Sequence, residues 1–185
     1  MVIEDSSRAP PGHASEPEWE QIKLLYNKPA ATLVAQWRRI GGDGLPIDEL
    51  YLRAVGETEY RKVAGGDNQI TCWDPVSCGR RPFVIFNAFK MSGMGGDWVS
   101  ICQIDLPRGN VKNLIDPGRL KVPNNYEAGW VASILDIDDE GRTILCRLAL
   151  ESARRTEVSV QYFVSEIDVA TGDISILAPL PNVFG

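Results

Sequence analysis

Few residues in this chain of 185 have the types and spacing that a chemical site requires. The one histidine, His13, lies in residues 1–14, a polar stretch without hydrophobic periodicity that we predict to be a disordered tail. A Ser-His-Asp triad, a Cys-His pair or a histidine metal site needs an imidazole held in a defined geometry. The sequence therefore argues against catalysis or metal binding that depends on histidine.

The four cysteines do not follow a metal-binding pattern. Cys72 and Cys78 are 6 positions apart, and Cys102 and Cys146 follow at intervals of 24 and 44. Structural zinc sites use paired ligands at short Cys-x₂₋₄-Cys spacings, so we predict no metal and no cofactor. Cys72 and Cys78 flank one predicted hairpin, where a disulfide is geometrically feasible, but the reducing cytosol favours free thiols.

The carboxylates offer one catalytic alternative. Asp136, Asp138 and Asp139 cluster near a predicted turn, and glycoside hydrolysis needs only a carboxylate pair about 5–10 Å apart. Aspartates followed by glycine are also what a tight turn requires, because the side chain bonds backbone amides inside the turn. We therefore interpret Asp138 and Asp139, together with Asp105 and Asp168, as turn residues, and keep a carboxylate-dependent hydrolase as an alternative.

A glycine-rich loop lies at residues 91–97, with the sequence MSGMGGD. A phosphate-binding loop leads from a strand into a helix, whereas this one leads into a predicted strand that starts at Trp98. We expect a flexible hairpin loop in which Met91, Met94 and Trp98 form an adaptable apolar contact surface.

Two repeat units, residues 70–115 and 130–181, organise the second half of the chain. Both contain Ile-Asp-x-x-x-Gly, and Asp105 and Gly109 are each 63 residues from Asp168 and Gly172. This pattern is typical of a β-hairpin. Each unit is predicted to be a four-stranded antiparallel meander, with strands near 70–74, 82–90, 98–106, 110–115, 130–137, 142–150, 158–169 and 173–178.

The order of strands and turns resembles a blade of the TolB-like (WD40-like) β-propeller repeat. In that family an Asp-Gly-Lys type of turn joins the first two strands and an Asp-x-x-x-Gly turn joins the last two. Residues 138–142 and 168–172 match these turns, whereas residues 74–80 depart from the first. The resemblance covers residues 70–181, about two blades, and implies a binding scaffold rather than a defined activity.

Two blades are too few for a closed propeller, which typically has about four to eight. Three solutions are open. Several chains assemble into a ring, or N-terminal helices cover the open sheet, or the eight strands form a sandwich or a barrel.

The N-terminal part is predicted to be helical over residues 15–56, ahead of a β domain at 57–185. A capping box at Ser15–Glu18 precedes one apolar stripe, Pro29 opens a second helix, and a third, short helix follows from Leu45. The fold class we expect is therefore mainly β with N-terminal α-helices.

Residues 116–129 connect the two units, and loops of this length often carry function. Together with the aromatic residues of the helical segment and the glycine-rich loop, this connection supplies the candidate partner-binding residues: Trp19, Trp37, Met91, Met94, Trp98, Arg119, Asn125 and Tyr126. We identify no catalytic, cofactor-binding or metal-binding residues.

The formal net charge of −6 argues against a nucleic acid or an anionic membrane as the main partner. The sequence shows no signal peptide and no apolar run of transmembrane length, so we expect a cytoplasmic protein. The function we predict is a non-catalytic protein–protein interaction or self-assembly module. A small-molecule-binding β-barrel carrier is a further alternative, beside the hydrolase.

Overall fold

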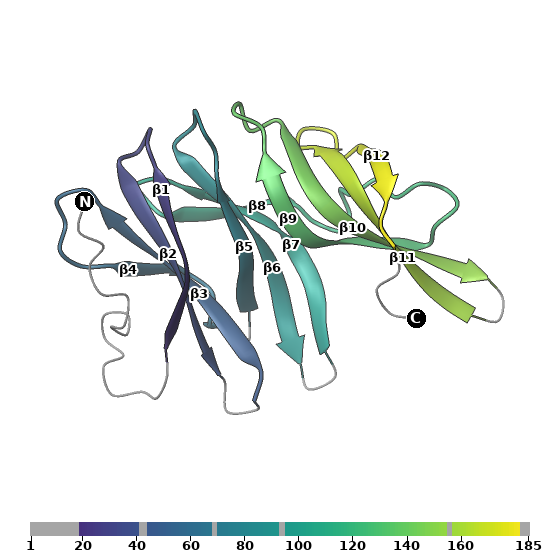
Figure 1. The fold of residues 1–185 in the computed structure, drawn as a ribbon, viewed down its shortest axis with the longest axis horizontal. Helices are drawn as coiled ribbons and strands as arrows, with labels where there is room; N and C mark the ends of the chain where they lie inside the picture. Colours follow the sequence, from purple (N-terminus) through teal and green to yellow (C-terminus); the bar gives the residue numbers. More distant parts are fainter. Residues whose placement is uncertain (1–18, 41–43, 68–69, 93–94, 155–156, 182–185) are drawn as a thin grey trace.

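The computed structural model describes residues 19–40, 44–67, 70–92, 95–154 and 157–181, and these residues form an all-β fold (Figure 1). Three four-stranded antiparallel sheets follow one another along the chain. Sheet 1 contains β1 (Glu20–Asn27), β2 (Thr32–Ile40), β3 (Pro46–Ala54) and β4 (Arg61–Ala64). Sheet 2 contains β5 (Ile70–Ser77), β6 (Phe83–Ser92), β7 (Gly95–Asp105) and β8 (Asn110–Ile115). Sheet 3 contains β9 (Ala128–Ile137), β10 (Thr143–Arg154), β11 (Glu157–Asp168) and β12 (Ile174–Pro179).

The prediction of N-terminal helices is wrong for the described part of residues 15–56, which forms β1, β2 and β3. The sequence pattern resembles helices because strands such as β2 are buried on both faces. In β2, Val34 is buried on one face and Ala35 on the other, so the apolar residues do not alternate. Without alternation the spacing of Leu33 and Trp37 fits a helix as well as a strand, and pairing with β1 and β3 decides. The capping box at 15–18 lies outside the described residues.

The strands predicted for the two repeat units are confirmed as sheets 2 and 3, with boundaries shifted by a few residues. Their last hairpins share one turn. Gly109 and Gly172 have φ of 78° and 76°, and their amides donate to the carbonyls of Asp105 and Asp168 at 2.7 and 2.8 Å. A left-handed residue at this point suits glycine, which is why the Ile-Asp-x-x-x-Gly pattern located the hairpins correctly.

The short strand β4 pairs with β3. Sheet 1 is therefore a third unit of the same kind, built from residues on both sides of position 57.

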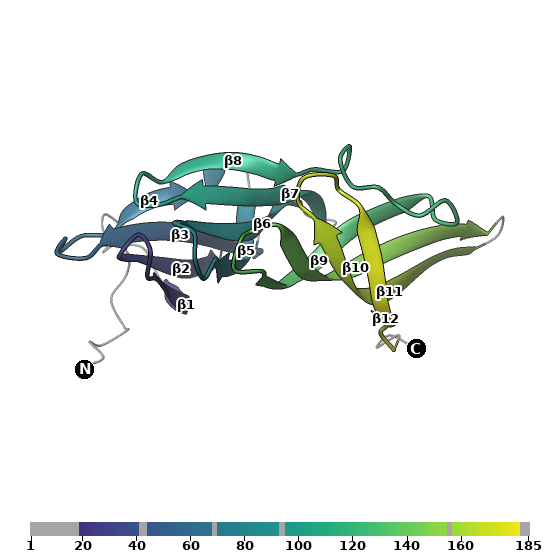
Figure 2. The same cartoon turned by 90° about the horizontal axis from the view of Figure 1, so that it is seen from above.

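The three sheets pack face to face in a row, with sheet 2 between the other two (Figures 1 and 2). β1 contacts β5 and β5 contacts β9, so the first strands of the sheets lie together along one edge, while β4 contacts β8 farther out. One apolar core, including Val34, Leu50 and Phe86, joins sheets 1 and 2. A second, including Ile85 and Leu148, joins sheets 2 and 3. The described strands form no closed barrel, and their stacking is compatible with a propeller-like arrangement.

An amide side chain at the same register links each sheet to the next. In β2, Gln36 Nε2 donates to the carbonyl of Cys72 on β5 at 3.0 Å. In β6, Asn87 Nδ2 donates to the carbonyl of Val131 on β9 at 2.8 Å. Both side chains are buried, and both links satisfy polar groups inside a junction. Gln36 Nε2 also donates to Asp48 Oδ2 at 2.8 Å, so the junction of sheets 1 and 2 contains a buried charged group as well.

Candidate protein-interaction surfaces

The first end face is the side of sheet 1 that points away from sheet 2. Because side chains alternate along a strand, Val34 points to sheet 2 and its neighbours Leu33 and Ala35 point away from it. The end face comprises Leu24, Tyr26, Leu33, Ala35, Trp37, Arg39, Ile47, Glu49, Tyr51, Arg53 and Lys62. Leu24 and Tyr26 are each 50% exposed, so this face presents apolar surface at β1.

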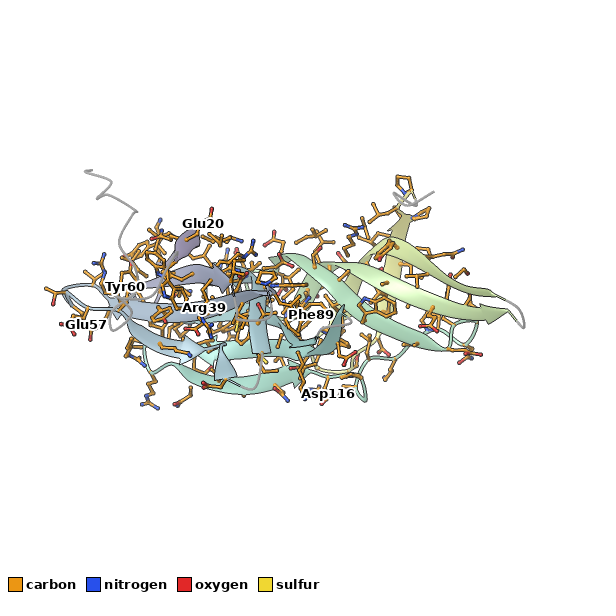
Figure 3. The ribbon with its side chains drawn as sticks, turned by 90° about the horizontal axis from the view of Figure 1, so that it is seen from below. Glu20, Arg39, Glu57, Tyr60, Phe89 and Asp116 are labelled. Carbon is orange, nitrogen blue, oxygen red and sulfur yellow. The ribbon has the colours of Figure 1, made fainter. Side chains whose placement is uncertain are left out.

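A buried carboxylate organises the charges on the first end face. Glu49, 2% exposed, accepts a hydrogen bond from the hydroxyl of Tyr51 at 2.7 Å. It also pairs with Lys62 at 3.1 Å and with Arg39 at 3.8 Å. Arg53 lies over the ring of Tyr60, 4.7 Å from its centroid. Three basic residues and one acidic residue therefore lie on this face, at the end of the molecule where Figure 3 labels Arg39 and Tyr60.

The second end face is the side of sheet 3 that points away from sheet 2. Its residues are Trp130, Asp136, Leu145, Arg147, Ala149, Glu151, Val160, Tyr162, Val164 and Glu166. The guanidinium of Arg147 lies over the ring of Tyr162, 4.6 Å from the centroid. The Nε atom of Arg147 is shielded from solvent and has no hydrogen-bond partner among the described residues. One basic residue and three acidic residues lie on this face.

The predicted aromatic contacts of the N-terminal segment fall on the first end face or beside it. Trp37 is 4% exposed and faces outward between β1 and β3. Trp19 packs edge-to-face on Tyr51, with ring centroids 6.5 Å apart, and Arg39 lies over its indole. The helical surface that the sequence predicts for these residues is not found: Trp37 lies in β2, and Trp19 precedes β1 and packs on Tyr51.

Met91 and Trp98 of the glycine-rich loop region lie in strands. Met91 is a buried residue of β6. Trp98, on β7, packs against the core of sheets 2 and 3 and donates from Nε1 to Asn87 Oδ1 at 2.8 Å. Met94 lies outside the described residues, as does His13. The contact role predicted for this loop stays a prediction.

The 116–129 connection fills the space between sheets 2 and 3 at their outer strands. Leu120 belongs to the core, and Arg119 donates to the carbonyls of Val169 and Ala170, both at 3.1 Å. Tyr126 packs against Phe163 and donates to Gln161 Oε1 at 3.2 Å, whereas Asn125 is exposed. Arg119 and Tyr126 thus hold the connection in place, and a role in partner binding stays a prediction.

A cavity lies between sheets 1 and 2, where the connection from β4 to β5 is much shorter than the 116–129 connection. It has a volume of about 300 Å³ and is lined by Val63, Cys72, Phe86, Cys102 and Asn113, among others. The volume is at the lower end of the range for small-molecule sites, about 300–1,000 Å³.

Of the aspartates interpreted as turn residues, Asp138 and Asp168 accept hydrogen bonds inside their turns, whereas the Asp105 carboxylate accepts one from Gln103 Nε2 and pairs with Lys112. Asp138 accepts hydrogen bonds from the amides of Arg142 and Thr143, and Asp168 accepts them from the amide and hydroxyl of Thr171. The bonds from Thr171 lower the pKa of Asp168 below its usual value. Asp136 and Asp138 line a pocket of about 350 Å³ together with Glu166.

The four thiols are free and buried, so the structure contains no Cys72–Cys78 disulfide. Burial raises the pKa of Cys72 and Cys102, and it raises the pKa of Cys146 to about 12. Among the residues that the structure describes, no group of three or more His, Cys, Asp or Glu side chains is placed to hold a metal ion. The described part of the chain also has no helix that is long and apolar enough to cross a membrane.

Asp74 joins sheets 2 and 3 and gives a prediction for the pH dependence of stability. It has φ of 50°, at the irregularity of β5, and its Oδ2 accepts from the amide of Ile134 at 3.3 Å. Burial raises its pKa, an effect opposed by the Ile134 bond and by Lys23 and reinforced by Asp48. The folded state therefore binds its proton more tightly than the unfolded state, and this group's contribution to stability falls as the pH rises from the ordinary carboxyl pKa through the raised one.

We expect Asp74→Asn to be more stable than the wild type at neutral pH and to lose this advantage as the pH falls below the ordinary carboxyl pKa. Asparagine keeps the acceptor and tolerates the left-handed backbone. Asp74→Ala should be less stable by about 1–2 kcal/mol, because it loses the acceptor. Urea unfolding of the three proteins across pH checks this, and a stability difference between Asp74→Asn and wild type that does not vary with pH would contradict it.

No protein-family model matches this chain, and a search of curated proteins found no similar sequence. The geometry of the three sheets and of their two end faces is therefore the basis on which a function is proposed.

Proposed function

We propose that this protein is a non-catalytic interaction module, built from propeller-blade-like sheets, that binds protein through its two end faces. The observation that supports this function is that the row of sheets ends, on both sides, in a face without a neighbouring described sheet. Sheets 1 and 3 each pack one face against sheet 2, and no other described sheet packs on their outer faces. Leu24 and Tyr26 of the first end face are half-exposed apolar side chains that favour protein contacts, whereas Ala35, Trp37 and Tyr51 of the same face are already buried in the single chain.

The composition of the end faces agrees with this function. Aromatic residues and arginine are enriched at protein interfaces, and the first end face carries Tyr26 and Arg53 while the second carries Trp130, Tyr162 and Arg147. The resemblance of residues 70–181 to TolB-like propeller blades supports a scaffold of the same kind.

Photo-cross-linking in cells that produce the full chain tests this function. A benzoylphenylalanine at Tyr26 and another at Tyr162, in separate variants, should each yield a discrete protein adduct on illumination. A matched position is Lys112 on β8, which is exposed and lies on neither end face. It should yield no such adduct. Leu24→Asp should remove the adduct formed from Tyr26, because it places a charge on the apolar part of that face.

Equal adducts from all three positions, or none from Tyr26 and Tyr162, would refute the proposed function. A second copy of the chain and a different protein are both acceptable partners in this experiment, and the mass of the adduct distinguishes them.

A further inference from the structure

The two end faces carry the same side-chain pattern as the two junctions inside the molecule. The sheets are aligned by register: Trp37 of β2 pairs with Gln21, Ala88 of β6 pairs with Cys72, and Leu148 of β10 pairs with Val131. The residue before each of these on the second strand is Gln36, Asn87 or Arg147. All three are hydrogen-bond donors. Gln36 and Asn87 point to the next sheet along the chain, and Arg147 points away from sheet 2.

Gln36 and Asn87 use this position to reach the first strand of the next sheet. Their acceptors, the carbonyls of Cys72 and Val131, occupy the same register on β5 and β9. Arg147 has the donor but no next sheet, and its shielded Nε lacks a partner among the described residues. The carbonyl at the same register in sheet 1 belongs to Gln21. Arg147 of sheet 3 therefore lacks an acceptor of the kind that the first strand of sheet 1 carries.

The faces that pack against a preceding sheet also share a pattern with the first end face. At the internal junctions, the faces that receive the preceding sheet carry Val84 and Phe86 in β6, and Ile144 and Cys146 in β10. The equivalent residues of β2 are Leu33 and Ala35, on the first end face. Ala35 is already buried in the single chain, so the apolar surface that this face offers to a preceding sheet comes from Leu33 and from the half-exposed Leu24 and Tyr26.

Two charged residues occupy positions that are buried at the internal junctions. Arg53 is equivalent to Ile104 and Ile167, both fully buried. Glu166 is equivalent to Leu52 and Gln103, both buried. The first end face has an excess of basic residues and the second an excess of acidic ones, so the two faces are complementary in charge.

We propose that the partner is a second copy of this chain, bound head-to-tail, with the first end face of each copy on the second end face of the other. Two copies supply six sheets, a number within the range in which propellers typically close, about four to eight. The two end faces lie at opposite ends of the molecule, so each copy has one face for each of two contacts (Figure 2). A head-to-tail contact that closes gives a ring of defined size. This inference rests on the proposed function.

Charge reversal tests the head-to-tail arrangement. Light scattering of the wild type should give twice the chain mass of 20.4 kDa over a roughly hundredfold range of concentration. Arg53→Glu and Glu166→Arg alone should each raise the dimer dissociation constant by at least about tenfold, because each puts like charges together at both contacts. Mixing equal amounts of the two variants should restore the dimer, since one contact is then the wild-type pair and the other the reversed pair.

Four further variants accompany the mixing experiment. Lys112→Glu, on neither end face, should leave the dimer intact. Leu24→Asp changes a half-exposed residue, and it should give a folded monomer even if Arg53→Glu fails to fold. Arg147→Gln restores the amide found at Gln36 and should keep the dimer, whereas Arg147→Ala should weaken it.

A wild type that is monomeric at every concentration would overturn the inference, as would a mixture of the variants that stays monomeric although each melts cooperatively. A dimer lost in Arg53→Glu but kept in Glu166→Arg would show a symmetric contact and overturn the head-to-tail arrangement. In each case adducts from Tyr26 and Tyr162 with another protein would leave the proposed function standing. Absence of all adducts would refute both.

Discussion

Gly172→Ala is expected to destabilise the protein by at least about 3 kcal/mol. Gly172 has φ of 76°, where an L side chain costs about 1–2 kcal/mol. An alanine Cβ would also lie 1.9 Å from the carbonyl oxygen of Arg119, a backbone atom that cannot move without shifting the 116–129 connection. The amide of Lys121 donates to the carbonyl of Gly172 at 3.0 Å, so this shift also removes a hydrogen bond, worth about 1 kcal/mol.

Gly56→Ala is the matched control for backbone strain. Gly56 has φ of 95°, and an added Cβ would meet no atom within 4 Å. This variant should lose only about 1–2 kcal/mol. Urea unfolding, followed by tryptophan fluorescence, measures both variants. Equal losses would show that the contact between the hairpin turn and the connection contributes little.

Asn87→Ala should cost about 2–4 kcal/mol, the second large effect that we expect. Asn87 is fully buried at the junction of sheets 2 and 3. Its loss leaves the carbonyl of Val131 without its side-chain donor and the Nε1 of Trp98 without its acceptor. A buried polar group without a partner costs about 1–3 kcal/mol. The same urea titration measures this loss, and the indole of Trp98 should report the altered junction through its fluorescence.

Asn125→Ala controls for the change in residue type, because Asn125 is exposed in the 116–129 connection. It should change the free energy of unfolding by less than about 0.5 kcal/mol. A loss below about 1 kcal/mol for Asn87→Ala would contradict the role that we assign to this amide. It would also weaken the comparison of Arg147 with Gln36 and Asn87.

Both large effects concern the junctions between sheets, and the end faces depend on the same junctions. The first and second end faces keep their relative orientation only if sheets 1 and 3 are both held firmly on sheet 2. Links such as Gln36 to Cys72 and Asn87 to Val131 provide this, since their hydrogen bonds require a specific register between neighbouring sheets. The partner binding that we propose at the end faces therefore depends on the stability of the junctions.

The candidate site was predictable only in part. Trp19 and Trp37 are predicted as partner-binding residues from their type and from a helical segment that the structure replaces with strands. The structure buries Trp37 on β2 and packs Trp19 on Tyr51, and their role in partner binding stays a prediction. Arg147 was visible in the sequence as a charge that interrupts an apolar strand face between Leu145 and Ala149. The role that we propose for Arg147 at the second end face follows from its equivalence to Gln36 and Asn87 in the strand register. No local sequence pattern shows this equivalence.

The sequence by itself determined the local structure of residues 70–181. Strand boundaries there follow from apolar runs and turn residues, and a turn such as Asp168–Gly172 is specified by contacts within a few residues, so it is legible in the chain. Only the tertiary structure decided that residues 19–64 form a third sheet. Strands buried on both faces lose the alternation that distinguishes them from helices, and their pairing partners lie too far along the chain for periodicity to show. The end faces are likewise a tertiary property, because they exist only once three sheets have stacked and left two faces without a neighbouring sheet among the described strands.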